Sequence, residues 1–257
     1  HYHLENTDDP LTYNGVVYNE MKGAFSSAEE VLDRSVFSAL FPDTPYGVES
    51  GGDPECIPEL TYEEFLDFHR KYYHPSNSYI YLYGNMDMEE KLDWMDREYL
   101  SRFEAARVDS AIPYQKPFKE WKSLVMDYPV LDDEPLEENT YLSASYVVGS
   151  SLDTTLNVAF TVLEYVLLDA PGAPVKQALL DAHVGKDISG SYEDSTCQPF
   201  FTIEAKNARE EDRERFLTII RETLEKLTQE GLDRKALASG INFFEFRFRE
   251  ADYATFP

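Results

Sequence analysis

The stretch "TYLSASYVVGSSLDTTLNVAFTVLEYVLL", residues 140–168, decides the fold of the second half of the chain. Its first ten residues are rich in aromatic and β-branched side chains, which predicts a strand, and the strongly apolar run from Thr154 to Leu168 predicts a helix. Further along, "DISGSYED" (187–194) and "FFTIEAKN" (200–207) predict two more strands. With helices expected near 174–183, 209–229 and 233–251, the pattern indicates an α+β fold.

The first half of the chain predicts mainly helices, which come in pairs. We expect a helix from a Thr12 cap to about Ala24, a second helix over 28–41, and a long loop over "FPDTPYGVESGGDPECIPEL", residues 41–60. Thr61 and Glu64 form a capping box for a third helix, and Asp87 caps a fourth that runs to about Phe103. Strands are expected at "SYIYLYG" (78–84) and "SLVMDYPV" (123–130), on either side of a weakly patterned, proline-containing linker.

Composition excludes several classes of partner. The net charge of −26 disfavours nucleic acid and anionic membrane surfaces, because both are bound through clustered Lys and Arg. We expect no membrane span, because Asn157, Thr161 and Glu164 interrupt the longest apolar run. Cys56 and Cys197 lack metal-ligand spacing and indicate free thiols in a reducing compartment. The chain begins at His1, so we expect a fragment of a longer protein.

One carboxylate in the first half needs an explanation. In "GVVYNEMKGAFSS" (15–27), a helix would place Glu20 on the same face as Val16, Val17, Gly23 and Ala24. We expect that face to be half-buried, and a buried carboxylate is costly without a positive partner, several hydrogen-bond donors or a metal ion.

The histidines do not assemble a site by themselves. His69 and His74 are five residues apart, which misses the i, i+4 spacing of a helical zinc pair, so a helix surface and a turn are the expected places for them. His1 and His3 could bind a metal, but a frayed terminus or a tag remnant is the interpretation we favour for them. The sequence also lacks a nucleophile elbow, a phosphate-binding loop and any HxxEH motif.

A weak internal repeat links the two halves. "GVVYNEMK", which starts at Gly15, aligns with "GINFFEFR", which starts at Gly240, and the alignment puts Glu20 opposite Glu245. If the repeat is real, the chain holds the later part of one α+β domain and the earlier part of a second.

Three strings carry a resemblance to a known family. "LTYNGVVYNEMKGAFSS" (11–27), "YGVESGGDPECIPELTYEEFLDFHRKYYHPSNSYIYLYGN" (46–85) and "INFFEFRFREADYATFP" (241–257) resemble the presequence protease and falcilysin branch of the pitrilysin, or insulinase-type, zinc metallopeptidases. In that family an HxxEH helix gives two His ligands and a Glu general base, and a Glu on a distant helix is the third zinc ligand. The resemblance implies that Glu20 is this third ligand and Zn²⁺ the cofactor. It implies no role for Glu245, which we expect to face solvent or to form a salt bridge.

The resemblance also implies an organisation and a function. Residues 1–107 would be the C-terminal part of a metallopeptidase domain, 108–121 a linker, and 122–257 the N-terminal part of a related, non-catalytic domain, both of the pitrilysin α/β-roll type. The intact parent would cleave unstructured peptides inside a closed chamber, whereas this chain alone would be inactive. Its partners would be those peptides and the rest of its own polypeptide, meaning the HxxEH segment and the C-terminal half.

Other possibilities stay open at this point. Some members of the family lack a working zinc site, so a non-catalytic structural or peptide-binding subunit is the alternative function. A bacterial cytoplasm and an organelle lumen are both possible locations. The Gly51-Gly52-Asp53 loop is as compatible with an ordered turn as with a chamber wall, and no substrate-binding residue can be named.

Overall fold

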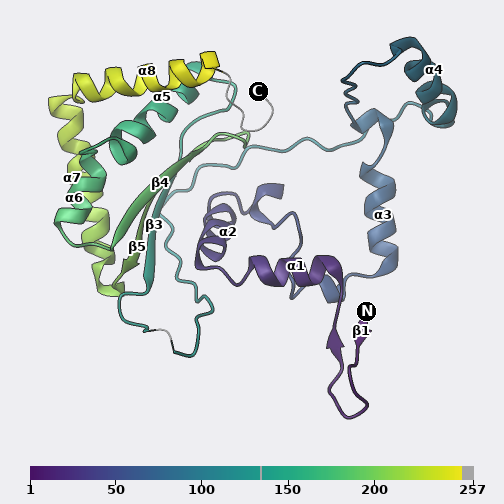
Figure 1. Ribbon diagram of the computed structural model, residues 1–257, viewed down its shortest axis with the longest axis horizontal. Helices are drawn as coiled ribbons and strands as arrows, with labels where there is room; N and C mark the ends of the chain where they lie inside the picture. The colour runs from purple at the N-terminus through teal and green to yellow at the C-terminus, as the bar shows by residue number, and fades with distance from the viewer. Residues whose placement is uncertain (134, 251–257) are drawn as a thin grey trace. The chain divides into compact units, whose positions relative to one another are not determined.

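The computed structural model describes residues 1–133 and 135–250. The chain divides into two compact units, of which the first comprises His1–Met21 and Gly51–Pro113 and the second comprises Lys22–Ser50 and Tyr114 onward. The boundaries predicted from the sequence, and the relation between the two predicted domains, stay predictions. The α+β class is confirmed, because helices pack on an antiparallel sheet in the second unit (Figure 1).

The second unit is built on a three-stranded antiparallel sheet with the order β3-β5-β4. Its strands are β3 (Thr140–Val147), β4 (Asp187–Glu193) and β5 (Phe200–Ala208). All three match predicted strands. The middle strand, β5, has buried side chains on both faces, as expected of a strand with neighbours on each side and helices above and below.

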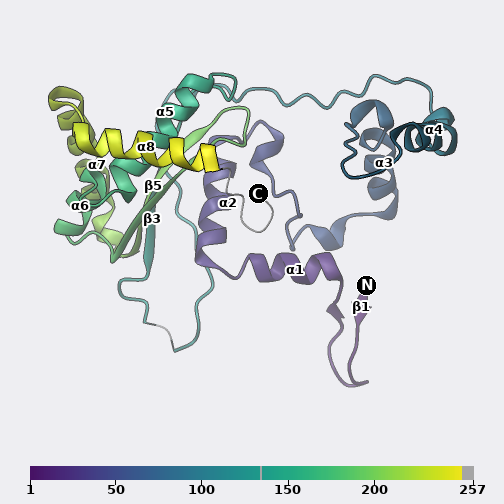
Figure 2. The same ribbon diagram turned by 45° about the horizontal axis from the view of Figure 1, so that its top comes forward.

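Helices cover the two faces of this sheet (Figures 1 and 2). On one face, Phe201, Ile203 and Ala205 of β5 join a core with the helical side chains Leu168, Leu179 and Phe216. On the other face, Phe200 packs against Phe37 and Phe41 at the end of α2. The helices of this unit are α2 (Ala28–Leu40), α5 (Thr154–Glu164), α6 (Pro174–Asp181), α7 (Arg213–Glu230) and α8 (Arg234–Glu250), and a π-helical turn, η5 (Tyr165–Asp169), extends α5.

Capping residues set the helix ends where the sequence predicts them. Asp233 accepts a hydrogen bond from the backbone N–H of Ala236 at 2.7 Å and begins α8. Gly231 ends α7 with a φ of 84°, a left-handed conformation that glycine adopts without strain. In the first unit, the Thr61 and Glu64 capping box is confirmed, with Thr61 N to Glu64 Oε2 at 2.9 Å and Glu64 N to Thr61 Oγ1 at 3.2 Å.

One helical run in the described residues, Thr154–Asp181, has the length and composition of a membrane span. The polar residues Asn157, Thr161 and Glu164, from which we expect no span, do not keep the run from this composition. The run is broken between α5 with its π-helical turn and α6, and its residues Val166, Leu168, Val175 and Leu179 are buried in the core beside the sheet. A buried core helix can have the same length and composition as a membrane span.

The first unit has little regular structure and no core. It contains a hairpin of β1 (Tyr2–His3) and β2 (Thr12–Tyr13), most of α1 (Val16–Ala24), α3 (Tyr62–Tyr72) and α4 (Met88–Glu98). Short 3-10 turns lie at Ile57–Glu59, Pro75–Asn77 and Leu100–Arg102. All residues of this unit are described, and none of them is buried.

Four predictions for local structure are wrong. Residues 78–84 and 123–130 do not form strands in the described chain, because no neighbouring strand pairs with them. Thr12 does not cap a helix; it pairs with His3 in the hairpin, and α1 starts at Val16. The helix predicted to reach Phe103 ends at Glu98, where the chain tightens into a 3-10 turn.

Candidate functional site

Glu20 is the fifth residue of the nine-residue helix α1, in its second turn, and its side chain is exposed. The expectation of a half-buried face is wrong: Val16 is 76% exposed and Val17 is 53% exposed, because no other described element covers this side of α1. Glu20 makes no hydrogen bond or ion pair with the described residues. The carboxylate and its apolar neighbours therefore present a surface that could meet another segment.

His69 and His74 lie where the sequence predicts them, but the expectation of a frayed end at His1 and His3 is wrong, because His3 pairs with Thr12 in the hairpin and the His1 amino group donates to the Asn14 carbonyl at 3.0 Å. The His69 ring stacks on Tyr73 at the end of α3, with ring centroids 4.7 Å apart. His74 Nδ1 accepts a hydrogen bond from the backbone N–H of Ser76 at 3.1 Å and so caps a 3-10 turn. Within residues 1–133 and 135–250, no three His, Cys, Asp or Glu side chains gather as metal ligands. A catalytic zinc ion takes three protein ligands, so the described residues do not form a complete zinc site. Glu20 would supply one of the three ligands.

Glu245, the residue opposite Glu20 in the internal repeat, has a different environment. Its Oε1 accepts hydrogen bonds from Nε and Nη2 of Arg249, one helical turn further along α8, at 2.9 and 2.6 Å. The expectation of a solvent-facing or salt-bridged carboxylate is confirmed. Glu245 thus has a built-in cationic partner, which Glu20 lacks among the described residues.

The Gly51-Gly52-Asp53 loop is an ordered turn. Asp53 Oδ1 accepts a hydrogen bond from the backbone N–H of Glu55 at 2.8 Å, and Gly52 has a φ of 91°. A Cβ on Gly51 would lie 2.4 Å from Sδ of Met21, the residue after Glu20. The glycine therefore lets this loop pass close to the end of α1.

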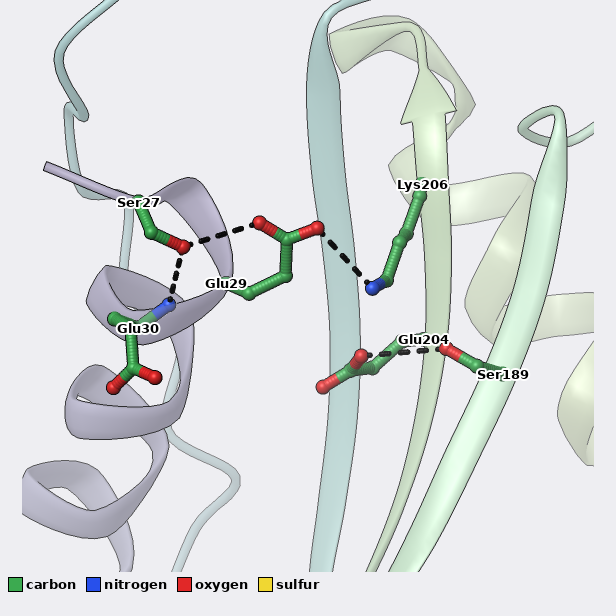
Figure 3. A network of polar contacts seen from close by, with 6 residues as sticks. All are labelled: Ser27, Glu29, Glu30, Ser189, Glu204 and Lys206. Atoms are coloured by element: carbon green, nitrogen blue, oxygen red, sulfur yellow. Dashed lines mark hydrogen bonds and ion pairs between the residues drawn. The ribbon is translucent and has the colours of Figure 1, made fainter. Parts of the chain in front are cut away.

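A polar cluster that was not predicted from the sequence joins α2 to the sheet (Figure 3). Lys206 Nζ on β5 donates to Glu29 Oε1 at 3.3 Å, and Ser189 Oγ on β4 donates to Glu204 Oε2 at 3.5 Å. Burial raises the pKa of Glu204, and nearby Asp33 raises it further. The available signal was the pair of charged residues inside the otherwise apolar string "FFTIEAKN". The contact between Glu29 and Lys206 ties α2 to β5, the strand whose Phe200 packs against Phe37 and Phe41.

Glu164, at the junction of α5 and its π-helical turn, has the largest resolved pKa shift among the described carboxylates. Burial and the nearby Asp169 raise its pKa to about 6, although a hydrogen bond from the Tyr192 backbone works in the opposite direction. Because the folded-state pKa lies above the ordinary value of 4.5, folding is favoured when this group is protonated. That contribution is present below about pH 4.5 and is lost as the pH rises through about 6.

We therefore expect Glu164→Gln to stabilise the folded chain at pH 8 by about 1 kcal/mol, allowing for the partial exposure of the side chain, and to have little effect at pH 4. The measurement is the free energy of unfolding in urea at both pH values. Glu222→Gln, at an exposed position of α7, is the control and should change neither value. Equal effects of Glu164→Gln at pH 4 and pH 8 would contradict the assignment.

Comparison with known proteins defines the class to which this fold belongs. The family described as "Peptidase M16 inactive domain" matches residues 59–243. The M16 inactive domain of Pseudomonas fluorescens has a similar structure, with a TM-score of 0.65 at 16% identity over 93% of this chain and 56% of that one. A chain of complex III from Candida albicans gives a TM-score of 0.66 at 11% identity, over 91% of this chain and 55% of that one. These two likenesses concern the fold alone.

Sequence relatives narrow the class. Protein HypA of Clostridium perfringens is 46% identical over all of this chain and 26% of its own length. Presequence protease 1 of Arabidopsis thaliana, a chloroplast and mitochondrial protein, is 39% identical over all of this chain and 24% of its own length. The chain belongs to the M16 peptidase family and, within it, to the presequence protease branch. It spans about a quarter of the length of these relatives.

Proposed function

We propose that this chain is one part of a zinc-dependent endopeptidase that degrades unstructured peptides inside a closed chamber, and that Glu20 is one of its zinc ligands. The observation that carries the proposal is the exposed Glu20 carboxylate on α1, which has no cationic partner in the described chain, in a protein of the M16 family. The two His ligands and the general base would come from an HxxEH segment elsewhere in the same polypeptide. The compartment would be a bacterial cytoplasm or an organelle lumen.

The same proposal gives the two parts of the chain different roles. Residues 1–107 would complete the metal-binding domain, and residues 122–257 would form part of a related domain without metal. The salt bridge between Glu245 and Arg249 supports this difference, because a carboxylate already paired with an arginine is a poor candidate for a ligand. Peptide substrates and the remainder of the polypeptide would be the chain's partners.

The 257-residue chain by itself should bind zinc weakly and should cleave no peptide. One carboxylate is one of the three protein ligands that a catalytic zinc normally uses, so we expect a dissociation constant no tighter than the millimolar range. Calorimetry with zinc and an assay with an unstructured fluorogenic peptide test this expectation. A tight site with one zinc per chain would show that the ligands lie elsewhere than proposed.

The alternative is a non-catalytic structural or peptide-binding subunit. The match to a family described as an inactive domain is the observation that favours it. The two functions differ in one readily checked feature, the presence of HxxEH in the complete gene product. Its presence supports the peptidase, and its absence together with full folding and peptide binding supports the subunit.

A further inference from the structure

Helix α2 rests on the sheet through two different kinds of contact. At its C-terminal end, the rings of Phe37 and Phe41 lie 5.0 and 5.8 Å from the ring of Phe200 on β5. At its N-terminal end the contact is polar, because Glu29 Oε1 accepts a hydrogen bond from Lys206 Nζ at 3.3 Å (Figure 3). The polar end therefore responds to pH, whereas the aromatic end has no group that titrates.

The sequence of β5 explains this difference. Side chains two residues apart in a strand lie on the same face, so Phe200, Thr202, Glu204 and Lys206 share the face that meets α2. Phe200 and Thr202 are 4% and 3% exposed, whereas Glu204 and Lys206 are half-buried. This face of the strand thus changes from buried to charged along its length, and the first turns of α2 meet the charged part.

Glu204 has weak partners for a half-buried carboxylate. In the described chain its side chain accepts one hydrogen bond, from Ser189 Oγ at the long distance of 3.5 Å (Figure 3). The ammonium group of Lys206 donates to Glu29. A buried carboxylate without strong partners costs free energy, and protonation removes that cost. Glu204 is therefore the group in this contact whose charge is least compensated.

The surrounding charges act in the same direction. The titratable groups that face Glu204 or its neighbours are Glu29, Glu30 and Asp33 on α2, Tyr141 on β3, Glu193 on β4 and Lys206 on β5. Burial and then the charge of Asp33 raise the pKa of Glu204 above its ordinary value of 4.5, although Lys206 opposes them. Packing of α2 is thus favoured when Glu204 is protonated. This contribution is complete below about pH 4.5 and is lost as the pH rises through the raised pKa.

A short connection joins α2 to the helix that carries Glu20. Helix α1 ends at Ala24 and α2 begins at Ala28. In between, the backbone N–H and the hydroxyl of Ser26 both donate to the carbonyl oxygen of Gly23, at 3.1 and 2.6 Å. A connection this short and this well bonded leaves little slack, so a displacement of the first turn of α2 also displaces the end of α1.

We propose that Glu204 is a proton-dependent switch that holds or releases the N-terminal end of α2, and that through α2 it controls the position of the Glu20 helix. With Glu204 protonated, this end of α2 lies firmly on β5. With Glu204 ionised, repulsion from Glu29 and Asp33 loosens it, while the aromatic end stays packed. The inference rests on the proposed function only in giving a metal-binding role to the helix that moves.

Hydrogen exchange in the metal-free, full-length protein at pH 5 and pH 8 tests the switch. Each rate is taken relative to that of an unstructured peptide at the same pH. We expect the amides of residues 31–35 to be protected at least about fivefold more at pH 5 than at pH 8, and those of residues 38–41 to differ by less than about twofold. Equal protection of residues 31–35 at both pH values would overturn the proposal, and so would an equal change at the two ends of α2.

Glu204→Gln separates the charge of this side chain from its packing. The variant should raise the protection of residues 31–35 at pH 8 at least about fivefold and change it by less than about twofold at pH 5, because the wild-type side chain is then already protonated. Glu225→Gln, at an exposed position of α7, is the matched control and should change neither value. An equal effect of Glu204→Gln at both pH values would show a purely structural role and overturn the switch.

The amides of residues 21–24 report on the link to Glu20. Their protection should change in the same direction as that of residues 31–35, by at least about twofold. No change in residues 21–24 would overturn the control of the Glu20 helix. The zinc proposal can fail without this one, because every measurement uses metal-free protein. Glu20→Gln should therefore leave the pH dependence of residues 31–35 within about twofold of the wild-type value.

Discussion

Glu20→Gln in the full-length protein is expected to lower both zinc affinity and peptide turnover by at least about 100-fold. The substitution keeps the size and the helix propensity of the side chain but removes the charge that would balance Zn²⁺. Because Glu20 is exposed and unpaired in the described chain, the stability of the metal-free protein should change by no more than about 0.5 kcal/mol. Metal analysis, peptide cleavage and urea unfolding of the same preparation give the three readouts.

Glu245→Gln is the matched control for this prediction. It makes the same chemical change at Glu245 of α8, the residue that aligns with Glu20 in the internal repeat. The Glu245 carboxylate accepts a hydrogen bond from Arg249. We expect zinc content to stay unchanged and turnover to stay within about threefold, because an exposed ion pair contributes little to stability. Equal losses in both variants would mean that the effect comes from a general loss of charge or structure and not from a ligand.

Gly190→Ala is expected to destabilise the chain by more than about 3 kcal/mol. A Cβ at this position of β4 would lie 2.4 Å from the backbone oxygen of Thr202 on β5 and 2.3 Å from Cδ1 of Leu168. The Leu168 side chain is fully buried and the Thr202 oxygen belongs to the sheet backbone, so neither can move away without disturbing the core. Urea unfolding followed by circular dichroism measures the loss.

Gly23→Ala makes the same chemical change where there is room. Nothing lies within 4 Å of a Cβ at Gly23, which is part of α1, so alanine should be neutral or stabilise by up to about 1 kcal/mol. If Gly190→Ala proved as well tolerated as Gly23→Ala, β4 could not pack as closely against β5 and η5 as the structure has it.

The second unit could be predicted well from the sequence because its elements find their partners within the chain. The strings that became β3, β4 and β5 pair with one another, and the apolar run after Asp153 packs on the sheet that they form. Local pattern and tertiary contacts therefore agree. The capping residues Asp233 and Gly231 were predictable for a similar reason, since their effect depends on the neighbouring backbone alone.

The first unit was predicted less well because strand propensity has no effect without a partner strand. "SYIYLYG" has the composition of a strand, yet no strand of the described chain pairs with it. The exposure of Glu20 has the same origin: the apolar neighbours in its sequence indicate burial, but Val16 and Val17 stay exposed in the described chain. The cluster of Glu29, Glu204 and Lys206 was missed because it joins elements far apart in the sequence.

A crystal structure of the full-length protein with zinc, solved with anomalous data at the zinc edge, tests the central claim most directly. The proposed function predicts a single strong anomalous peak with a carboxylate oxygen of Glu20 at about 2.0–2.2 Å and two histidine nitrogens from outside residues 1–257 at about 2.0–2.1 Å. A zinc ion held by protein ligands that do not include Glu20 would contradict the claim.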